Sequence, residues 1–169
     1  MFTEKDYNLI TARIIRCAIE VHKELGPGLM ESVYEVCLKR VLQLAGLQVI
    51  SRVVVPIYYN NEKLDKDFII DLLVEEKVIV ELKSVEVILP VHEAQLVTYL
   101  KLSGKKLGLL INFNVPLLNI SVLLSQSLKL FSPCSLYPCI SVFFPKPPLI
   151  HKIPLASNIF ARAIAALPS

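Results

Sequence analysis

The sequence predicts an α/β sandwich whose core follows the order helix, three strands, helix and strand. Apolar residues recur at helical spacing before position 46, whereas β-branched residues dominate between positions 47 and 83. A further helical segment then separates these strands from a short apolar one. At 169 residues the chain is long enough to bury the core of one domain without disulfides.

Two helices are predicted at the start of the chain. Thr3 with Asp6 resembles a capped helix start, and Gly26-Pro27-Gly28 ends that first helix. A second helix is predicted from Leu29 to Ala45, because Gly46 suits its C-terminal end and the next segment is β-branched. The first helix carries apolar residues at helical spacing: Leu9, Ile10, Ile14, Cys17, Ala18, Val21 and Leu25.

The middle of the chain predicts strands and one more helix. Residues 47–59 form a predicted strand that ends at the Asn60-Asn61 turn, and residues 68–74 and 78–83 form a tight hairpin. Pro90 suits the first turn of a helix to about Ser103, which Gly104 ends. Residues 107–113 are almost wholly apolar, which is typical of a strand inside a sheet.

The composition changes after Asn119, so we predict a domain over residues 1–119 and a tail over residues 120–169. The tail holds seven of the eleven prolines, four isolated cations and no acid. We expect it to be disordered or loosely packed; the alternative is a shift of the reading frame near Asn119. Lys129 and the prolines argue against a membrane span between residues 120 and 144.

Charge and cysteine usage exclude some classes of protein. Residues 1–119 hold 14 of the 18 Lys and Arg and all 15 Asp and Glu, a net charge of −1, so overall charge is poor evidence for nucleic-acid binding. The four cysteines form no close pair and no cluster with histidine, which argues against a zinc site. With a polar start and no secretory signal, we expect a reducing, cytoplasmic location.

Three residues of the predicted hairpin can carry chemistry. Alternation along a strand places Glu81 and Lys83 on one face, and Asp71 lies in the apolar run Ile69 to Leu73. An unpaired carboxylate is costly there, so one interpretation is a buried ion pair. The other is phosphodiester hydrolysis, in which two carboxylates hold a divalent metal and the lysine stabilises developing charge.

The second helix offers a third carboxylate. Glu31 falls on one helical stripe with Tyr34, Leu38 and Leu42, so we expect it to face the core. The alternative is a glutamate that the helix dipole favours in the first turn. Tyr34 by itself is more often a core tyrosine than a functional one.

The helix after Pro90 carries a polar stripe of His92, Gln95, Tyr99 and Ser103. This stripe lies opposite Glu93 and Lys101, which we expect to face solvent, so the stripe should point inward. Its members form either a structural hydrogen-bond network or a support in which Gln95 and Tyr99 orient metal ligands, water or a phosphate.

These residues resemble a known family. The segment from Gly28 to Tyr34 is similar to the name-giving motif of the GxxExxY proteins, which belong to the PD-(D/E)XK nuclease superfamily. Gln95 with Tyr99 is similar to the Gln-x-x-x-Tyr motif of the exonuclease-like branch of that superfamily. The resemblance covers about residues 5–119 and continues through Asp71, Glu81-Leu82-Lys83, the segment 90–96, Tyr99-Leu100-Lys101 and the segment 106–113.

The resemblance implies a PD-(D/E)XK nuclease-like core with a mixed four-stranded sheet flanked by helices. It implies Mg²⁺ or Mn²⁺ as cofactor and nucleic acid as partner, with DNA favoured over RNA and no membrane. It also implies Glu31, Asp71 and Glu81 as metal ligands and Lys83 as the catalytic base partner, with Tyr34, His92, Gln95 and Tyr99 supporting them. The alternatives are a catalytically inactive nucleic-acid-binding or regulatory module of the same fold and a frameshifted, non-functional product.

Overall fold

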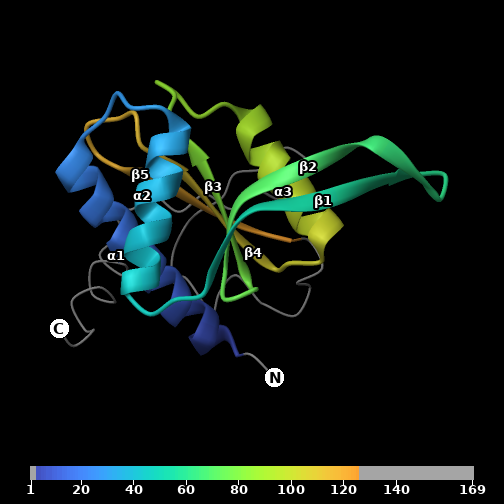
Figure 1. Ribbon diagram of the computed structural model, residues 1–169, viewed down its shortest axis with the longest axis horizontal. Helices are drawn as coiled ribbons and strands as arrows, with labels where there is room; N and C mark the ends of the chain where they lie inside the picture. Colours follow the sequence, from blue (N-terminus) through green and yellow to red (C-terminus); the bar gives the residue numbers. More distant parts are fainter. Residues whose placement is uncertain (1–2, 126–169) are drawn as a thin grey trace, which may run out of the picture.

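The structure, a computed structural model, describes residues 3–125. These residues form a five-stranded sheet covered by helices on both faces (Figure 1). In chain order the elements are α1 (Glu4–Leu25), α2 (Glu31–Leu44), β1 (Val49–Tyr59), β2 (Glu62–Val74), β3 (Val78–Lys83), α3 (Pro90–Ser103), β4 (Leu107–Asn112) and β5 (Asn119–Leu124). The predicted fold class, a mixed sheet flanked by helices, is confirmed.

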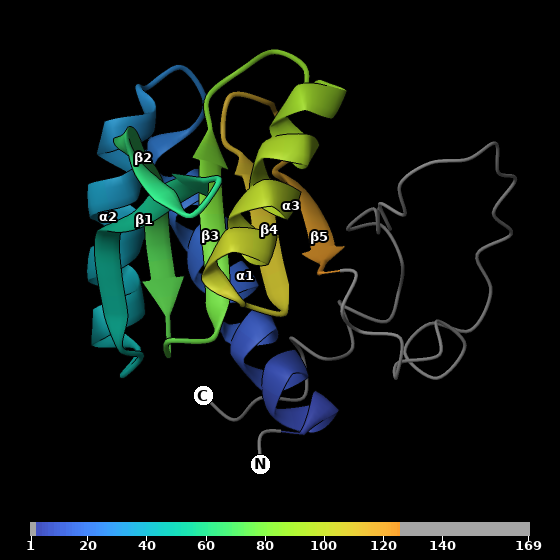
Figure 2. The ribbon, with the colours of Figure 1, turned by 90° about the vertical axis from the view of Figure 1, so that its right-hand side faces the viewer.

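The strands follow one another across the sheet in the order β1-β2-β3-β4-β5. Only β3 and β4 pair in parallel among the described strands, and the other neighbours are antiparallel. The helix α3 makes the crossover between the two parallel strands, as such a connection requires. Their carboxyl ends therefore lie at one edge of the sheet, next to the loop that precedes α2 (Figure 2).

Two apolar layers hold the helices against the sheet. One layer joins α1 and α2 to Leu72, Val80 and Leu82, whereas the other joins α3 to Leu73 and Ile79 on the opposite face. The packing of α3 is tight: a Cβ added at Gly108 of β4 would lie 2.8 Å from the side chain of Leu96. Strand alternation thus decides which residues of β2 and β3 face α3.

The turns were predicted well. The side chains and backbones of Thr3 and Asp6 form the predicted capping box at the start of α1. The Asn60-Asn61 turn has positive φ angles of 50° and 64°, and Glu75 and Glu76 likewise have φ angles of 52° and 54°. Asparagine tolerates this conformation best, and it is typical of two-residue hairpin turns.

The strand β5 corrects the predicted domain boundary and the number of strands. Residues 120–124 pair with β4, and Ile120, Val122 and Leu123 are buried, so the sheet has five strands and continues past Asn119. Because β4 is buried along its whole length, a partner is needed for its outer backbone groups. The rest of the predicted tail, from residue 126, lies outside the described residues.

None of the three helices in the described part of the chain combines the length and the apolar character that crossing a bilayer requires.

Candidate active site at the fork between β2 and β3

The strands β2 and β3 separate at Asp71. Their pairing ends at Leu72 and Val80, although β2 continues to pair with β1 beyond that point. At the fork the backbone N–H of Leu82 donates a hydrogen bond of 2.8 Å to Oδ2 of Asp71. The carboxylate of Asp71 thus replaces the missing strand partner and is held beside β3.

A kink in β1 and β2 explains how Asp71 can turn sideways. Leu72 faces α1 and α2, but its neighbours Ile70 and Leu73 both face α3, so regular alternation fails at Asp71. In the register of β1, Arg52 lies opposite Asp71 and has a positive φ of 55°. Strained backbone of this kind is costly for a residue other than glycine and is enriched at functional sites.

Glu81 and Lys83 share the face of β3 that looks toward α3, as predicted. Nζ of Lys83 donates a 2.8 Å hydrogen bond to Oε1 of Glu81. Glu81 is only 2% exposed, and its other oxygen, Oε2, is buried without a hydrogen-bond partner among the described residues. A buried carboxylate oxygen without a partner is costly, so a ligand that coordinated Oε2 would remove a real penalty.

The surroundings raise the pKa of all three central groups. Burial first, and then the charge of Asp71, raises the pKa of Glu81 to about 7, against the opposing effect of Lys83. Burial also raises the pKa of Asp71, although the N–H of Leu82 opposes the rise. Burial alone would lower the pKa of Lys83, but the hydrogen bond and charge of Glu81 outweigh it and raise that pKa. The lysine therefore stays cationic at neutral pH.

Glu31 is the first residue of α2 and is exposed, which corrects the prediction that it faces the core. Its Oε1 accepts a 3.1 Å hydrogen bond from the backbone N–H of Ser84, directly after β3. Its charge contributes to the raised pKa of both Asp71 and Glu81. Glu31 therefore lies over the edge of the sheet near the other two carboxylates. Its place in the first turn also agrees with the alternative based on the helix dipole.

Tyr34 shapes the loop that carries Glu31. It is fully buried, and its hydroxyl donates to the carbonyl oxygen of Gly26 at 2.6 Å and accepts from the N–H of Leu29 at 3.2 Å. Its ring stacks on Phe113 with the ring centres 4.4 Å apart. The structure thus agrees with a core tyrosine that positions the segment 26–30.

The polar stripe of α3 is divided between support of the site and helix structure. Nε2 of Gln95 donates to the hydroxyl of Tyr99 at 2.6 Å, and the pKa of Tyr99 is raised by burial and, to a smaller extent, by the nearby charge of Glu81. His92 instead accepts a hydrogen bond from the N–H of Leu89 through Nδ1, which caps the helix. Only Gln95 and Tyr99 of this stripe therefore lie beside the central residues.

The remaining predictions for α3 concern Ser103 and the two charged residues of the helix, Glu93 and Lys101. The hydroxyl of Ser103 donates to the carbonyl oxygen of Tyr99, a bond within the helix. Lys101 is exposed as predicted, but Glu93 is only 3% exposed, so the prediction that it faces solvent is wrong. The helix is therefore buried on more than one side, which a simple two-sided helical wheel does not predict.

Three supporting residues were not predicted. Asn112 is 1% exposed; its Oδ1 accepts from the N–H groups of Val85 and Asn114, and its Nδ2 donates to the carbonyl oxygen of Val85. The hydroxyl of Ser84 donates to the carbonyl oxygen of Leu29 at 2.6 Å. The charge of Glu35 contributes to the raised pKa of Asp71.

Sequence signals existed for two of the three. Asn112 is a polar residue at the end of an apolar strand, and Glu35 follows Glu31 by one helical turn. Ser84 had no signal, because its role depends on which loops meet at this edge of the sheet.

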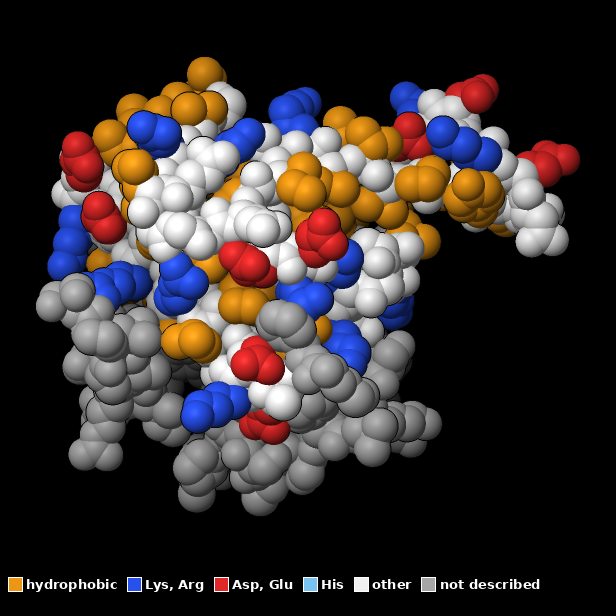
Figure 3. Space-filling model, turned by 60° about the horizontal axis from the view of Figure 1, so that its bottom comes forward, with side chains coloured by type: hydrophobic (Ala, Val, Ile, Leu, Met, Phe, Trp, Pro, Cys, Tyr) orange, Lys and Arg blue, Asp and Glu red, His pale blue; other side chains and the backbone are white. Residues whose placement is uncertain are grey.

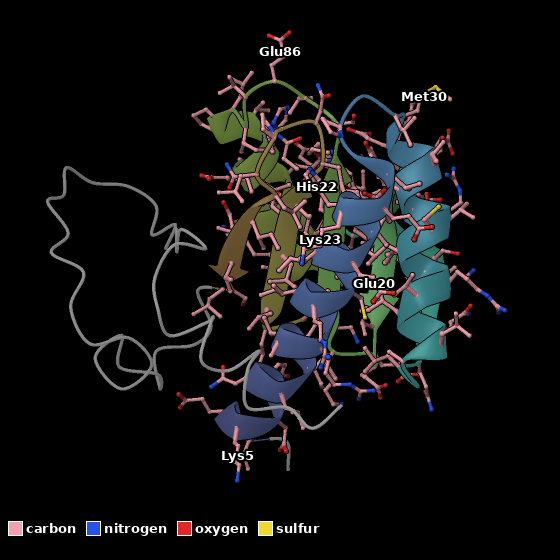
Figure 4. All side chains as sticks on the ribbon, turned by 90° about the vertical axis from the view of Figure 1, so that its left-hand side faces the viewer. Lys5, Glu20, His22, Lys23, Met30 and Glu86 are labelled. Atoms are coloured by element: carbon pink, nitrogen blue, oxygen red, sulfur yellow. The ribbon has the colours of Figure 1, made fainter. Side chains whose placement is uncertain are left out.

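A depression of about 610 Å³ opens at this edge. Figure 4 shows the loops that bound it, with Met30 before α2 and Glu86 in the β3–α3 loop at the same end of the molecule. Glu31 belongs to its wall, so the depression begins where the candidate site reaches the surface. Its lining residues are Gly28, Leu29, Met30, Glu31, Ser32, Ser84 and Asn114.

The carboxylates suit a hard divalent cation. The hydrogen bonds described above engage one oxygen each of Glu31, Asp71 and Glu81, and Oε2 of Glu81 has no partner within residues 3–125. Oxygen ligands of this kind favour Mg²⁺ or Mn²⁺. Within residues 3–125, however, no three Asp, Glu, His or Cys side chains are grouped closely enough to hold a metal ion as they stand. The predicted three-ligand set therefore stays a prediction, whereas the chemistry of Asp71 and Glu81 fits.

The comparison with protein families defines the class of protein. Residues 8–122 match the model of the PD-(D/E)XK nuclease superfamily, which is more than half of the chain. The chain belongs to the PD-(D/E)XK nuclease superfamily. This match does not distinguish the GxxExxY proteins from other members, so that finer assignment stays a prediction. No curated protein and no solved structure matches the chain.

Membership of this superfamily indicates a nuclease-type function and a nucleic-acid substrate. Its nucleases typically depend on divalent metal ions, which agrees with the carboxylates at the fork.

Proposed function

We propose that the protein is a metal-dependent nuclease that hydrolyses phosphodiester bonds in DNA, and less readily in RNA. One observation supports this above the others: Glu81 is buried and hydrogen-bonded to Lys83 through one oxygen, while its other oxygen has no partner in the described part of the chain. A purely structural ion pair would be expected to satisfy both oxygens. A site that takes up a cation leaves one oxygen for it.

The carboxylates and the lysine would have different roles in phosphodiester hydrolysis. Asp71 and Glu81, with Glu31 at the edge of the sheet, would hold Mg²⁺ or Mn²⁺. When bound, such an ion polarises the phosphate and favours ionisation of a water molecule. Lys83 supplies a fixed positive charge within reach of Glu81 and stabilises the charge that develops on the phosphate.

The surrounding residues keep this arrangement rigid. Gln95 and Tyr99 form a hydrogen-bonded pair beside the carboxylates, and His92 fixes the start of the helix that carries them. Tyr34 fixes the loop before Glu31. We also propose that the protein works in the cytoplasm, which agrees with the free thiols of Cys17 and Cys37.

The test is incubation of the purified full-length chain with single-stranded, duplex and branched DNA and with RNA. Each substrate is assayed with Mg²⁺, with Mn²⁺ and with EDTA, and Lys83→Met serves as the matched inactive variant. We expect cleavage that requires the metal and that Lys83→Met abolishes. Binding of nucleic acid without any metal-dependent cleavage would instead favour the inactive binding or regulatory module.

A further inference from the structure

The hairpin of β1 and β2 extends beyond the body of the protein as a two-stranded arm, which we define as residues 56–67. Pro56 pairs with Asp67 at its base, and Tyr58 and Tyr59 pair with Lys63 and Glu62 at its tip, with a register shift between them that places residues 64–66 opposite Ile57. Its base is fixed where the ring of Phe68 packs on Tyr99 with the ring centres 5.2 Å apart. Figure 1 shows the arm reaching out past α3, and Figure 3 shows it clear of the body.

The tip of the arm carries side chains that the fold does not need. Tyr58 and Tyr59 are 61% and 67% exposed, and the Asn60-Asn61 turn follows them. Large aromatic side chains usually contribute by burial, and these two contribute nothing to either apolar layer. Together the four residues present hydroxyl and amide groups, which donate hydrogen bonds to phosphate oxygens and to base edges.

The arm is continuous with the candidate site, because both lie on β2. The strand β2 carries both Lys63 near the tip and Asp71 at the fork, eight residues further on. At about 3.3 Å per residue, these two points lie at most roughly 26 Å apart, because the register shift between them bends the strand. Base pairs of a duplex follow one another at about 3.4 Å, so this span corresponds to roughly 8 base pairs. A two-stranded ribbon also fits the major groove of a duplex.

We propose that the arm binds duplex nucleic acid about 8 base pairs to one side of the scissile bond, through Tyr58, Tyr59, Asn60 and Asn61. This inference rests on the proposed nuclease function and adds the form of the substrate. The arm carries two lysines, Lys63 and Lys66, against three acids, so it has no net positive charge to attract phosphate groups. We therefore expect its contacts with the duplex to be neutral hydrogen bonds. Binding through the arm should therefore depend little on salt.

A second copy of the chain fits the arm less well. A stable protein interface uses roughly 20 to 30 residues a side, whereas the arm has 12 residues, from 56 to 67. The exposed side chains of the arm also alternate between apolar, basic and acidic ones (Figure 3), so they form no continuous apolar patch.

The experiment compares the full-length parent with the double variant Tyr58→Ser and Tyr59→Ser, in which only exposed side chains change. The control is Leu44→Ser, an equally exposed apolar residue at the end of α2 far from Glu31. Binding is measured by fluorescence anisotropy, with Ca²⁺ present, on hairpin-closed DNA duplexes from roughly 6 to roughly 24 base pairs. Cleavage of the shortest duplex with Mg²⁺ is followed in parallel.

We expect the double variant to bind the shortest duplexes as the parent does and to lose about 10-fold or more on duplexes longer than roughly 8 base pairs. That loss should be the same at low and high salt. Equal affinities at every length, or an equal loss at every length, would overturn the role of the arm. A parent dimer that dissociates in the variant would assign the arm to a second copy of the chain and would also overturn the proposal.

The two proposals fail differently. If the parent cuts the shortest duplex but the arm variant shows no dependence on length, the arm inference is wrong and the nuclease function stands. If the parent neither binds nor cuts any duplex, the inference about the arm fails, and the nuclease function fails as well only if single-stranded DNA, branched DNA and RNA are also left uncut.

Discussion

Replacing Glu81 by glutamine should stabilise the protein at pH 8 when no divalent metal is present. Burial raises the pKa of this carboxyl group from 4.5 to about 7, so the folded state holds the proton more tightly than the unfolded chain. The contribution of Glu81 to stability is therefore neutral below pH 4.5 and becomes increasingly unfavourable as the pH rises to about 7. Glutamine is uncharged at every pH and removes this penalty.

The size of the effect follows from the pKa. The difference between 4.5 and about 7 corresponds to about 3 kcal/mol at pH 8, since one pKa unit is worth about 1.4 kcal/mol. The value of about 7 already includes the opposing effect of Lys83, so nothing further is subtracted for that hydrogen bond. We expect a gain of roughly 2 to 3 kcal/mol, or roughly 5 to 15 °C in Tm for a domain of this size.

The assay is thermal unfolding followed by circular dichroism in EDTA at several values between pH 5 and pH 8. Glu62→Gln is the matched control, because Glu62 is exposed on the arm and the substitution is chemically identical. The stability gain of Glu81→Gln should grow with pH, whereas Glu62→Gln should show almost none. Adding Mg²⁺ should stabilise the parent more than the variant. A variant that is less stable than the parent at pH 8 would show that Glu81 serves the fold as an ion pair.

Three further outcomes follow from the structure. Asp71→Asn should weaken Mg²⁺ binding, measured by calorimetry, and a higher metal concentration should partly restore its activity. Lys83→Met should bind the metal as the parent does, while its rate of single-turnover cleavage falls by roughly 100-fold or more. A chain ending after Ser125 should melt near the temperature of the full chain, whereas one ending after Asn119 lacks three buried apolar residues of β5 and should lose roughly 5 kcal/mol by chemical denaturation. Asn112→Ala removes the side chain that bonds the backbone groups of Val85, so it should cost about 1 to 3 kcal/mol of stability and lower the affinity for the metal. An unchanged metal affinity would limit Asn112 to a role in the fold.

Local patterns predicted the elements and the central residues well. The cap at Thr3, the turn at Asn60-Asn61 and the alternation that brings Glu81 and Lys83 to one face all depend on residues near one another in the sequence. The strand β5 was missed because polar and apolar residues alternate only from Asn119 to Val122, which is too short a run to predict a strand without its partner β4. Its existence depends on pairing, which composition does not encode.

The errors at the site have a common physical cause. Glu31 was expected to face the core because it shares a helical stripe with Tyr34, but it occupies the first turn, where the helix projects beyond the sheet edge. Glu93 was expected in solvent because it is charged, but α3 is covered there. In both cases the helical wheel describes one helix alone: it omits where Glu31 lies along α2 relative to the end of β3, and it omits the burial of α3 at Glu93.

The fork between β2 and β3 explains how one small sheet can hold two acids with opposite requirements. Glu81 needs burial, which the central strand β3 supplies, and burial makes its ionisation costly. Asp71 needs access to Glu81, which regular pairing would deny, because a paired strand directs its side chains above or below the sheet. The kink opposite Arg52 breaks that rule at one residue, and the hydrogen bond from Leu82 then fixes the carboxylate beside β3. The strain at Arg52 and the uncompensated oxygen of Glu81 are thus two costs of the same arrangement, and a bound cation would offset the second.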